Sequence, residues 1–170
     1  MTMPPPPLAE AAGETVFDRL LAVVGQSGLP HVIHAHAPTR TMDEAAKNLT
    51  FDLARIVKTV AFASRDGGLV LAALPGLRRV AYPQLAALLG CSRRDLSPLS
   101  PDEVVSRLGV APGSVSPLAL GGDAAIYVDA GVLAIAPTLY CGFGRPDRTL
   151  EIAPADLVVL AGGRTGAFSK

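Results

Sequence analysis

A predicted β-hairpin over residues 56–75 constrains the fold of this chain more than any other part of the sequence. The segment reads "IVKTVAFASRDGGLVLAALP". Residues 56–64 and 69–75 are apolar runs of strand length, and "RDGG" between them supplies glycines for the positive φ angles of a tight turn. We therefore expect a sheet that contains this antiparallel pair.

Helices and further strands are expected on both sides of the hairpin. Apolar residues at helical spacing, N-terminal capping residues and terminal glycines predict helices over 14–25, 42–49, 82–90, 100–109 and 153–163. Further strands are predicted over 30–38, 125–134, 138–143 and 148–154. Because these elements do not alternate as βαβ units, we expect one α+β domain with a mixed or largely antiparallel sheet. Residues 1–13 contain four consecutive prolines and are expected to be a flexible extended segment, so the domain is assigned to 14–170.

Lys58 interrupts the apolar run of the first hairpin strand. An ammonium group inside a strand is costly unless it is paired or faces a cavity. A lysine on an edge strand can instead extend its long side chain to the surface. Taken alone, the sequence leaves both interpretations open.

Three other features are candidates for chemistry. The loop "GSVSP", Gly113–Pro117, has small residues that allow a ligand to approach its backbone, although taken alone it reads as a turn. Asp129 in "YVDAG" either caps a turn at the end of a strand or lines a polar pocket. His34 and His36 would share one face of a strand, but two histidines are too few for a convincing metal site, and no metal is expected.

Composition excludes several functional classes. The chain has 15 Lys and Arg against 15 Asp and Glu, so it lacks the positive excess of a protein that coats nucleic acid. Any nucleic-acid contact would need a local basic patch, for which Arg78, Arg79, Arg93, Arg94 and Arg107 are candidates, although these can also be ordinary solvated charges. Two cysteines at unrelated positions, no apolar run long enough to span a bilayer and no secretory leader predict a cytoplasmic protein that binds neither membrane nor DNA.

Four segments in order carry a resemblance to a known family. They are "RIVKTVAF", "LVLAALPGLRRV", "LGVAPGSVSPLAL" and "YVDAGVL". Together they resemble the YbaK-like aminoacyl-tRNA deacylases, which include the editing domain inserted in many bacterial prolyl-tRNA synthetases and its free-standing relatives. The resemblance runs from about Phe17 to about Leu160, and the lysine strand together with the GxxxP loop is its most specific part.

The resemblance implies a barrel-like central sheet with flanking helices and a pocket for the 3′-terminal aminoacyl adenosine of a mischarged tRNA. It implies hydrolysis of the ester between amino acid and ribose, with no metal and no cofactor. Lys58 matches the family's essential lysine and is the expected catalytic residue. The expected substrate-binding residues are Thr59, Gly113, Ser114, Val115, Ser116, Pro117, Asp129 and Gly144.

The resemblance leaves the substrate open. Alanine-specific relatives carry a histidine in a "GFHP"-like segment, whereas this chain reads "YCGFGRPDRTLEI" and has no histidine there. Its "GSVSPLAL" loop, by contrast, is similar to that of the alanine-acting branch, so Ala- and Cys-tRNA(Pro) both stand as expected substrates, with a synthetase as a possible partner. The alternative is a module that binds tRNA ends or nucleotides in the same pocket without turnover.

Overall fold

The structure is a computed structural model, and it describes residues 14–38 and 51–170. Its helices are α1 (Val16–Ser27), α3 (Tyr82–Leu89), α4 (Pro101–Glu103), α5 (Ala130–Leu133) and α6 (Pro154–Ala161). Its strands are β1 (His31–Ala35), β2 (Ile56–Ser64), β3 (Leu69–Pro75), β4 (Leu96–Pro98), β5 (Ala125–Asp129), β6 (Leu139–Gly142), β7 (Arg148–Ile152) and β8 (Thr165–Gly166). The helix predicted over 42–49 and the flexible segment predicted over 1–13 lie outside the described residues.

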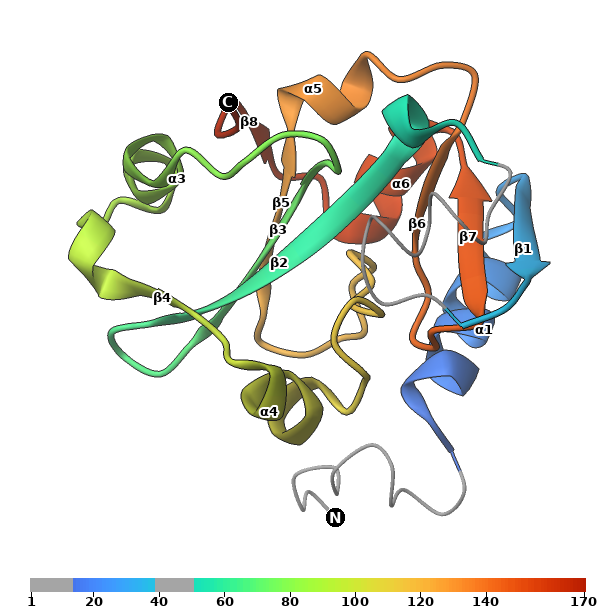
Figure 1. Ribbon diagram of the computed structural model, residues 1–170, viewed down its shortest axis with the longest axis horizontal. Helices are drawn as coiled ribbons and strands as arrows, with labels where there is room; N and C mark the ends of the chain where they lie inside the picture. Colours follow the sequence, from blue (N-terminus) through green and yellow to red (C-terminus); the bar gives the residue numbers. More distant parts are fainter. Residues whose placement is uncertain (1–13, 39–50) are drawn as a thin grey trace.

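A mixed eight-stranded sheet organises the domain, as predicted. Seven of its strands follow the order β1-β7-β6-β2-β3-β5-β8, and β4 pairs with β2 beside this path. The predicted hairpin is present: β2 and β3 are antiparallel, with Lys58 opposite Leu74. The β2–β6 and β3–β5 pairs are parallel, whereas β6–β7 and β1–β7 are antiparallel. Figure 1 shows β2 as a long strand that crosses the molecule and meets β4 at one end and β6 at the other.

Two of the helices begin at capping boxes, and α1 lies two residues further along the chain than the helix predicted over 14–25. Thr15 and Asp18 form a capping box at the start of α1, and Ser100 and Glu103 form one at the start of α4. After α4 the chain continues as a π-helical turn over Val104–Leu108, so the helix predicted over 100–109 is present but widened in its second half. Gly90 after α3 adopts the left-handed conformation that ends a helix.

The two faces of the sheet bury different sets of residues. Side chains alternate along β2. Val57 and Ala61 therefore lie in the larger apolar core with α1 and α6, on what we call the Thr59 face. Phe62 lies in a second core with α3 and Phe168, on what we call the Lys58 face. In Figure 1, α3 covers the left part of the sheet, while α1 and α6 lie toward its right part.

The structure corrects one predicted strand and adds two short ones. The strand expected over 125–134 ends at Asp129, because the Asp129 carboxylate accepts a hydrogen bond from the Gly131 amide and begins α5. The short strands β4 and β8 were not predicted, since three and two residues are too few to show an apolar alternation.

Candidate functional site

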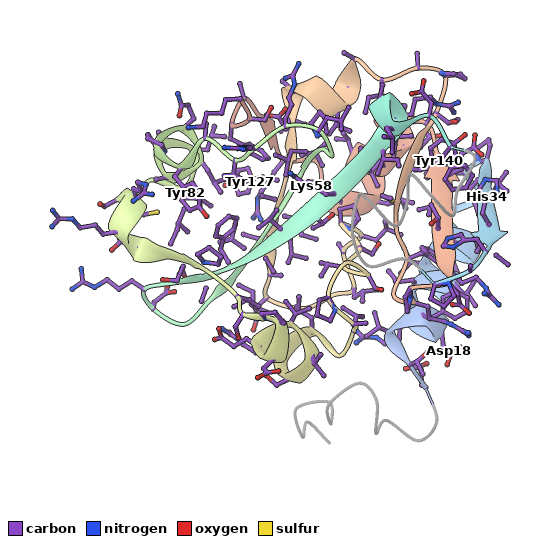
Figure 2. All side chains as sticks on the ribbon, in the orientation of Figure 1. Asp18, His34, Lys58, Tyr82, Tyr127 and Tyr140 are labelled. Carbon is purple, nitrogen blue, oxygen red and sulfur yellow. The ribbon has the colours of Figure 1, made fainter. Side chains whose placement is uncertain are left out.

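Lys58 lies in the middle of β2, on the face that also carries Val60 and Phe62 (Figure 2). Its side chain is half-buried, and burial lowers the pKa of its ammonium group below the ordinary value, with a further lowering from the positive charge of Arg79. Within residues 14–38 and 51–170, Lys58 forms no ion pair and no side-chain hydrogen bond. The strand therefore holds a partly desolvated cation that the described protein does not neutralise.

The sheet has a gap at Lys58. On the side of β2 away from β3, β6 pairs with Ile56 and Val57, and β4 pairs with Phe62–Ser64. The Leu99 amide donates to the Ala61 carbonyl at 2.9 Å, which extends the second pairing by one residue. Lys58, Thr59 and Val60 have no strand partner on that side among the described residues, and we call these three residues the β2 gap. An interruption inside a sheet exposes backbone that a neighbouring loop or a ligand can reach.

The Gly113–Pro117 loop packs against the end of β6, next to this gap. Gly142 is the residue after Cys141, which is opposite Val57, so Gly142 and Lys58 are the next residues along two parallel strands. A Cβ atom on Gly142 would lie 2.5 Å from the Val115 carbonyl oxygen, so only glycine permits this approach. The Gly144 amide also donates to the Ser114 carbonyl at 2.9 Å. The loop thus packs on the residue of β6 that is level with Lys58 in the parallel pair.

Three buried hydroxyl groups accompany this region. Thr59 Oγ1, Ser114 Oγ and Ser116 Oγ are inaccessible to solvent and have no hydrogen-bond partner among the described residues. Buried polar groups in proteins are nearly always paired. All three belong to the predicted substrate-binding residues, and no other residue of that set has a hydroxyl group.

The remaining predicted loop residues have different surroundings. Gly113 is exposed and has a positive φ of 87°, whereas Val115 and Pro117 are buried. Gly144 has a positive φ of 83°, and a Cβ atom there would lie 3.0 Å from Leu20 Cδ1 on α1. A side chain at position 144 would therefore adopt an unfavourable backbone conformation and crowd the first turn of α1.

Asp129 is committed to the protein itself. Its side chain is buried, and its carboxylate accepts hydrogen bonds from the amides of Gly131 and Phe168 at 2.9 and 2.7 Å and from Ser169 Oγ at 2.7 Å. Of the two interpretations from the sequence, the structure shows the capping one. Asp129 fastens the C-terminal residues to the end of β5.

Sequence reasoning missed a polar cluster on the Lys58 face beyond the gap. Glu151 Oε1 lies 2.7 Å from His34 Nε2, and Glu151 also accepts from Thr138 and pairs with Arg55 at 3.4 Å. The hydrogen bonds from Thr138 and then from His34 lower the pKa of Glu151. The Tyr140 ring stacks on Phe51 with centroids 4.0 Å apart, and Figure 2 shows Tyr140 and His34 close together. Alternation along β6 and β7 could have placed these side chains on one face, but not beside β2.

His34 lies in β1, whereas His36 follows the last residue of that strand, so the predicted strand contains only the first of this pair. Both histidines contact protein groups. His34 contacts Glu151, while His36 Nε2 lies 2.7 Å from Thr149 Oγ1. Over the described parts of the chain, no group of three His, Cys, Asp or Glu residues is arranged to hold a metal ion.

The candidate basic residues do not form one patch. Arg107 donates to the Gly67 carbonyl at 2.7 Å, and the Arg93 guanidinium lies over the Tyr82 ring at 4.9 Å from its centroid. Arg78 and Arg79 follow β3 and are exposed. Of these arginines, Arg79 is the one whose charge acts on Lys58.

A separate cavity of about 440 Å³ lies against the Thr59 face. Its walls come from α1, the turn after α4, and strands β3 and β5, and are mainly aliphatic. Val115 and Ser116 line it, whereas Lys58 does not. The Gly113–Pro117 loop therefore contributes to one wall of this cavity.

Fold and site together define a class: a mixed α+β domain that presents a lysine at a gap in its sheet, beside a small-residue loop. A model of the aminoacyl-tRNA editing domain matches residues 36–160. This match covers most of the chain, and the protein belongs to the aminoacyl-tRNA editing domain family.

Individual relatives agree with this assignment. The chain is 33% identical over 98 residues to a proline–tRNA ligase of Thermosipho melanesiensis, which covers 57% of this chain but 17% of the ligase. It is 26% identical over 117 residues to the uncharacterized protein YwhH of Bacillus subtilis, covering 69% of this chain and 72% of that protein. The chain thus spans only about a sixth of the synthetase that it matches.

Two solved structures have the same fold. The crystal structure of a hypothetical protein superposes with a TM-score of 0.80 at 29% identity, covering 89% of this chain and 99% of that one. A protein proposed to be a trans-editing enzyme for prolyl tRNA synthetase superposes with a TM-score of 0.74 at 25% identity, covering 91% and 97% of the two chains. Among the described residues, no helix is long and apolar enough to cross a membrane.

Proposed function

We propose that this protein is a free-standing trans-editing deacylase, which hydrolyses the ester bond of a mischarged aminoacyl-tRNA. The observation that carries the proposal is Lys58, a half-buried ammonium without a described counter-ion, located at a gap in the sheet beside the Gly113–Pro117 loop. Membership in the editing-domain family supports the reaction class.

In this reaction, water attacks the carbonyl carbon of the ester. The bond from that carbon to the ribose oxygen breaks, the ribose oxygen takes up a proton, and free amino acid and intact tRNA leave. Negative charge develops on the carbonyl oxygen during attack, and a fixed cation in a partly desolvated site stabilises that charge more than water does. Lys58 supplies such a cation.

The unpartnered hydroxyls give the site a means of orientation. The Ser114 and Ser116 hydroxyls belong to the loop beside Lys58, and a shift of that loop would let them hydrogen-bond to the ribose hydroxyl or the carbonyl region of a bound substrate. The Thr59 hydroxyl is on the opposite face of β2, where it is a third unpaired donor and acceptor. Because an aminoacyl ester is already reactive, correct positioning supplies much of the rate and a nucleophilic side chain is not required. Cys141 is unsuited to that role, since burial raises the pKa of its thiol to about 12.

We propose Ala-tRNA(Pro) or Cys-tRNA(Pro) as the substrate. A proline–tRNA ligase is among the relatives, and one structural neighbour is proposed to edit for prolyl tRNA synthetase. Both substrates carry a small amino acid, which is compatible with a loop packed so closely on Gly142. A prolyl-tRNA synthetase is the proposed partner that brings the mischarged tRNA.

The test is a deacylation panel with Ala-tRNA(Pro), Cys-tRNA(Pro), Pro-tRNA(Pro) and Ser-tRNA(Ala). Lys58→Ala is run beside the wild type, and Arg65→Ala is the matched control, because Arg65 is an exposed cation just after β2. We expect loss of one mischarged species, no loss of Pro-tRNA(Pro), and a reduction of roughly a hundredfold or more in Lys58→Ala only.

Two outcomes would contradict the proposal. If Lys58→Ala remains folded and hydrolyses the substrate at the wild-type rate, Lys58 does not act in the reaction. If the wild type turns over no member of the panel but retains charged tRNA in a filter-binding assay, the protein is a binding module for tRNA ends.

A further inference from the structure

Lys58 has an unusual electrostatic environment. No carboxylate among the described residues acts on its ammonium group, and the one charged side chain that does act on it is Arg79, which has the same sign. Arg79 itself has no ion pair or side-chain hydrogen bond within the described chain. Two like charges that act on each other, with no carboxylate from the described residues beside them, favour binding of an anion.

The backbone of Arg79 is held firmly in place. Its amide donates to the Lys170 carbonyl at 2.9 Å, and the Lys170 amide donates to the Arg79 carbonyl at 2.8 Å. The neighbouring Val80 forms a β-bridge with Ser169, and the side chain of Phe168 is fully buried in the core under α3. Asp129 fastens this tail through Phe168 and Ser169. Arg79 thus has a fixed backbone, unlike an arginine in an ordinary surface loop.

Strand register places the two cations at the rim of one apolar core. Lys58 is opposite Leu74 and two residues before Val60, and both of these residues lie in the core under α3. Arg79 precedes Val80, which packs on the same core. The Gly76 amide donates to the Ile56 carbonyl at 2.8 Å, so the chain that leads to Arg79 turns back beside the start of β2.

We propose that Arg79 binds a phosphate group, namely the phosphodiester on the 5′ side of the terminal nucleoside of an aminoacyl-tRNA, beside the Lys58 ammonium that acts on the ester. This inference rests on the proposed function and adds Arg79 as a substrate-binding residue. An esterified amino acid has no free carboxylate, and its α-amino group is a cation that two positive charges repel. The fixed anion nearest to the ester in such a substrate is this phosphodiester, and an arginine fork suits phosphate oxygens.

The test compares two minimal substrates that differ only in that phosphate. One is adenosine and the other 5′-AMP, each carrying the same amino acid as a 3′-ester. We expect Arg79→Ala to lower kcat/KM for the AMP ester roughly tenfold or more, mainly through KM, and to leave the adenosine ester unchanged. Arg79→Lys should recover part of the loss, because it keeps the charge but not the fork.

Arg78→Ala is the matched control. Arg78 is the neighbouring exposed arginine, and its guanidinium donates to Ser169 Oγ at 3.3 Å, so it should not affect the phosphate dependence. The assignment is overturned if Arg79→Ala lowers the rate on both esters equally, because Arg79 would then act without contacting the phosphate. It is also overturned if Arg78→Ala produces the same selective loss.

A binding measurement separates this inference from the proposed reaction. Titration with 5′-AMP and with adenosine, followed by NMR or calorimetry, needs no catalysis. We expect wild-type protein to bind 5′-AMP more tightly than adenosine, and Arg79→Ala to lose that difference. If neither ester is hydrolysed but the difference is present, the reaction fails and the phosphate site stands. If the esters are hydrolysed and the difference is absent, the phosphate site fails and the reaction stands.

Discussion

The two faces of the sheet differ in how their side chains are used. On the Thr59 face, mainly aliphatic residues from α1, α6 and five strands form one continuous core. On the Lys58 face, a small core under α3 lies at one end and the His34–Glu151–Tyr140 cluster at the other. Lys58 lies between them. In strand β2, the side chains of Val57 and Ala61 therefore pack in the core and stabilise the fold. On the other face of the same strand, Lys58 carries a half-buried charge that lowers the stability of the fold.

The difference indicates where stability and activity are separable. Substitutions in the aliphatic core of the Thr59 face, excluding Thr59 and the Gly113–Pro117 loop, should change folding and leave turnover of the folded fraction intact. Substitutions on the Lys58 face should do the opposite, because functional sites commonly retain groups that are unfavourable for stability. The predictions below test this division, starting from the largest expected effect.

Leu150→Ala should have the largest effect on stability. Leu150 is fully buried in the core of the Thr59 face, and truncation of such a side chain leaves a cavity that costs about 3 kcal/mol of unfolding free energy. Urea denaturation measures the loss, with Val159→Ala as a control, since Val159 is 67% exposed and should change little. A fall in kcat/KM of the folded fraction would show that the faces are not separable.

Gly142→Ala should reduce both stability and activity. The added Cβ would lie 2.5 Å from the Val115 carbonyl oxygen, so the Gly113–Pro117 loop must shift away from Lys58. We expect a cost of about 2 kcal/mol and a loss of deacylation of roughly a hundredfold.

Denaturation and single-turnover assays on the same Gly142→Ala preparation measure both. The control is Gly122→Ala, because a Cβ there meets nothing within 4 Å. Full activity in Gly142→Ala would mean that the position of the loop is unimportant for the reaction.

Glu151→Gln should have a smaller, pH-dependent effect. Hydrogen bonds from Thr138 and His34 lower the pKa of Glu151, so its contribution to stability is present above the ordinary carboxyl pKa and is lost as pH falls through the lowered value. We expect a loss of about 1 kcal/mol at neutral pH. Denaturation curves from pH 7 down to about pH 3 should converge for the two proteins; a constant difference would show that ionisation of Glu151 is not the cause.

Lys58→Met should be slightly more stable than the wild type. The pKa of Lys58 is lowered by burial, so its charged form costs stability at all pH values below that lowered pKa, and the cost disappears as pH rises toward the ordinary value of about 10.5. We expect a gain on the order of 0.5 kcal/mol at neutral pH, because solvent screens a half-buried ammonium. Thermal unfolding at pH 7 and pH 10 measures it, and a destabilised Lys58→Met at pH 7 would show that Lys58 contributes to the fold.

Elements of the fold could be predicted where they depend on residues that are close together in the sequence. The capping residues of Ser100–Glu103 and the "RDGG" turn depend on residues a few positions apart, and both appear as expected. The strand over 125–134 was predicted too long, because Ala130–Leu133 is as apolar in a helix as in a strand and only the Asp129 cap decides between them.

The site was predictable in part, through the joint occurrence of Lys58 and the GxxxP loop. What no local pattern could reveal is the β2 gap, because it depends on where β4 and β6 stop pairing with β2. The role of Gly142, and the hydrogen bonds that Asp129 accepts from the C-terminal residues, were hidden for the same reason. Their partners, Val115 and Phe168, are distant in sequence and meet them only in the folded chain.

The parallel pairing of β2 with β6 also has a kinetic consequence. Ile56 pairs with Tyr140, and in the sequence α3, α4 and the Gly113–Pro117 loop lie between these two residues. Pairings between residues so far apart in the sequence form late in folding. The β2–β3 hairpin can form early, because its partners are adjacent in sequence. A chain that is still being synthesised can therefore hold Lys58 in a strand while the gap, the loop and the sheet edge that define the site do not yet exist.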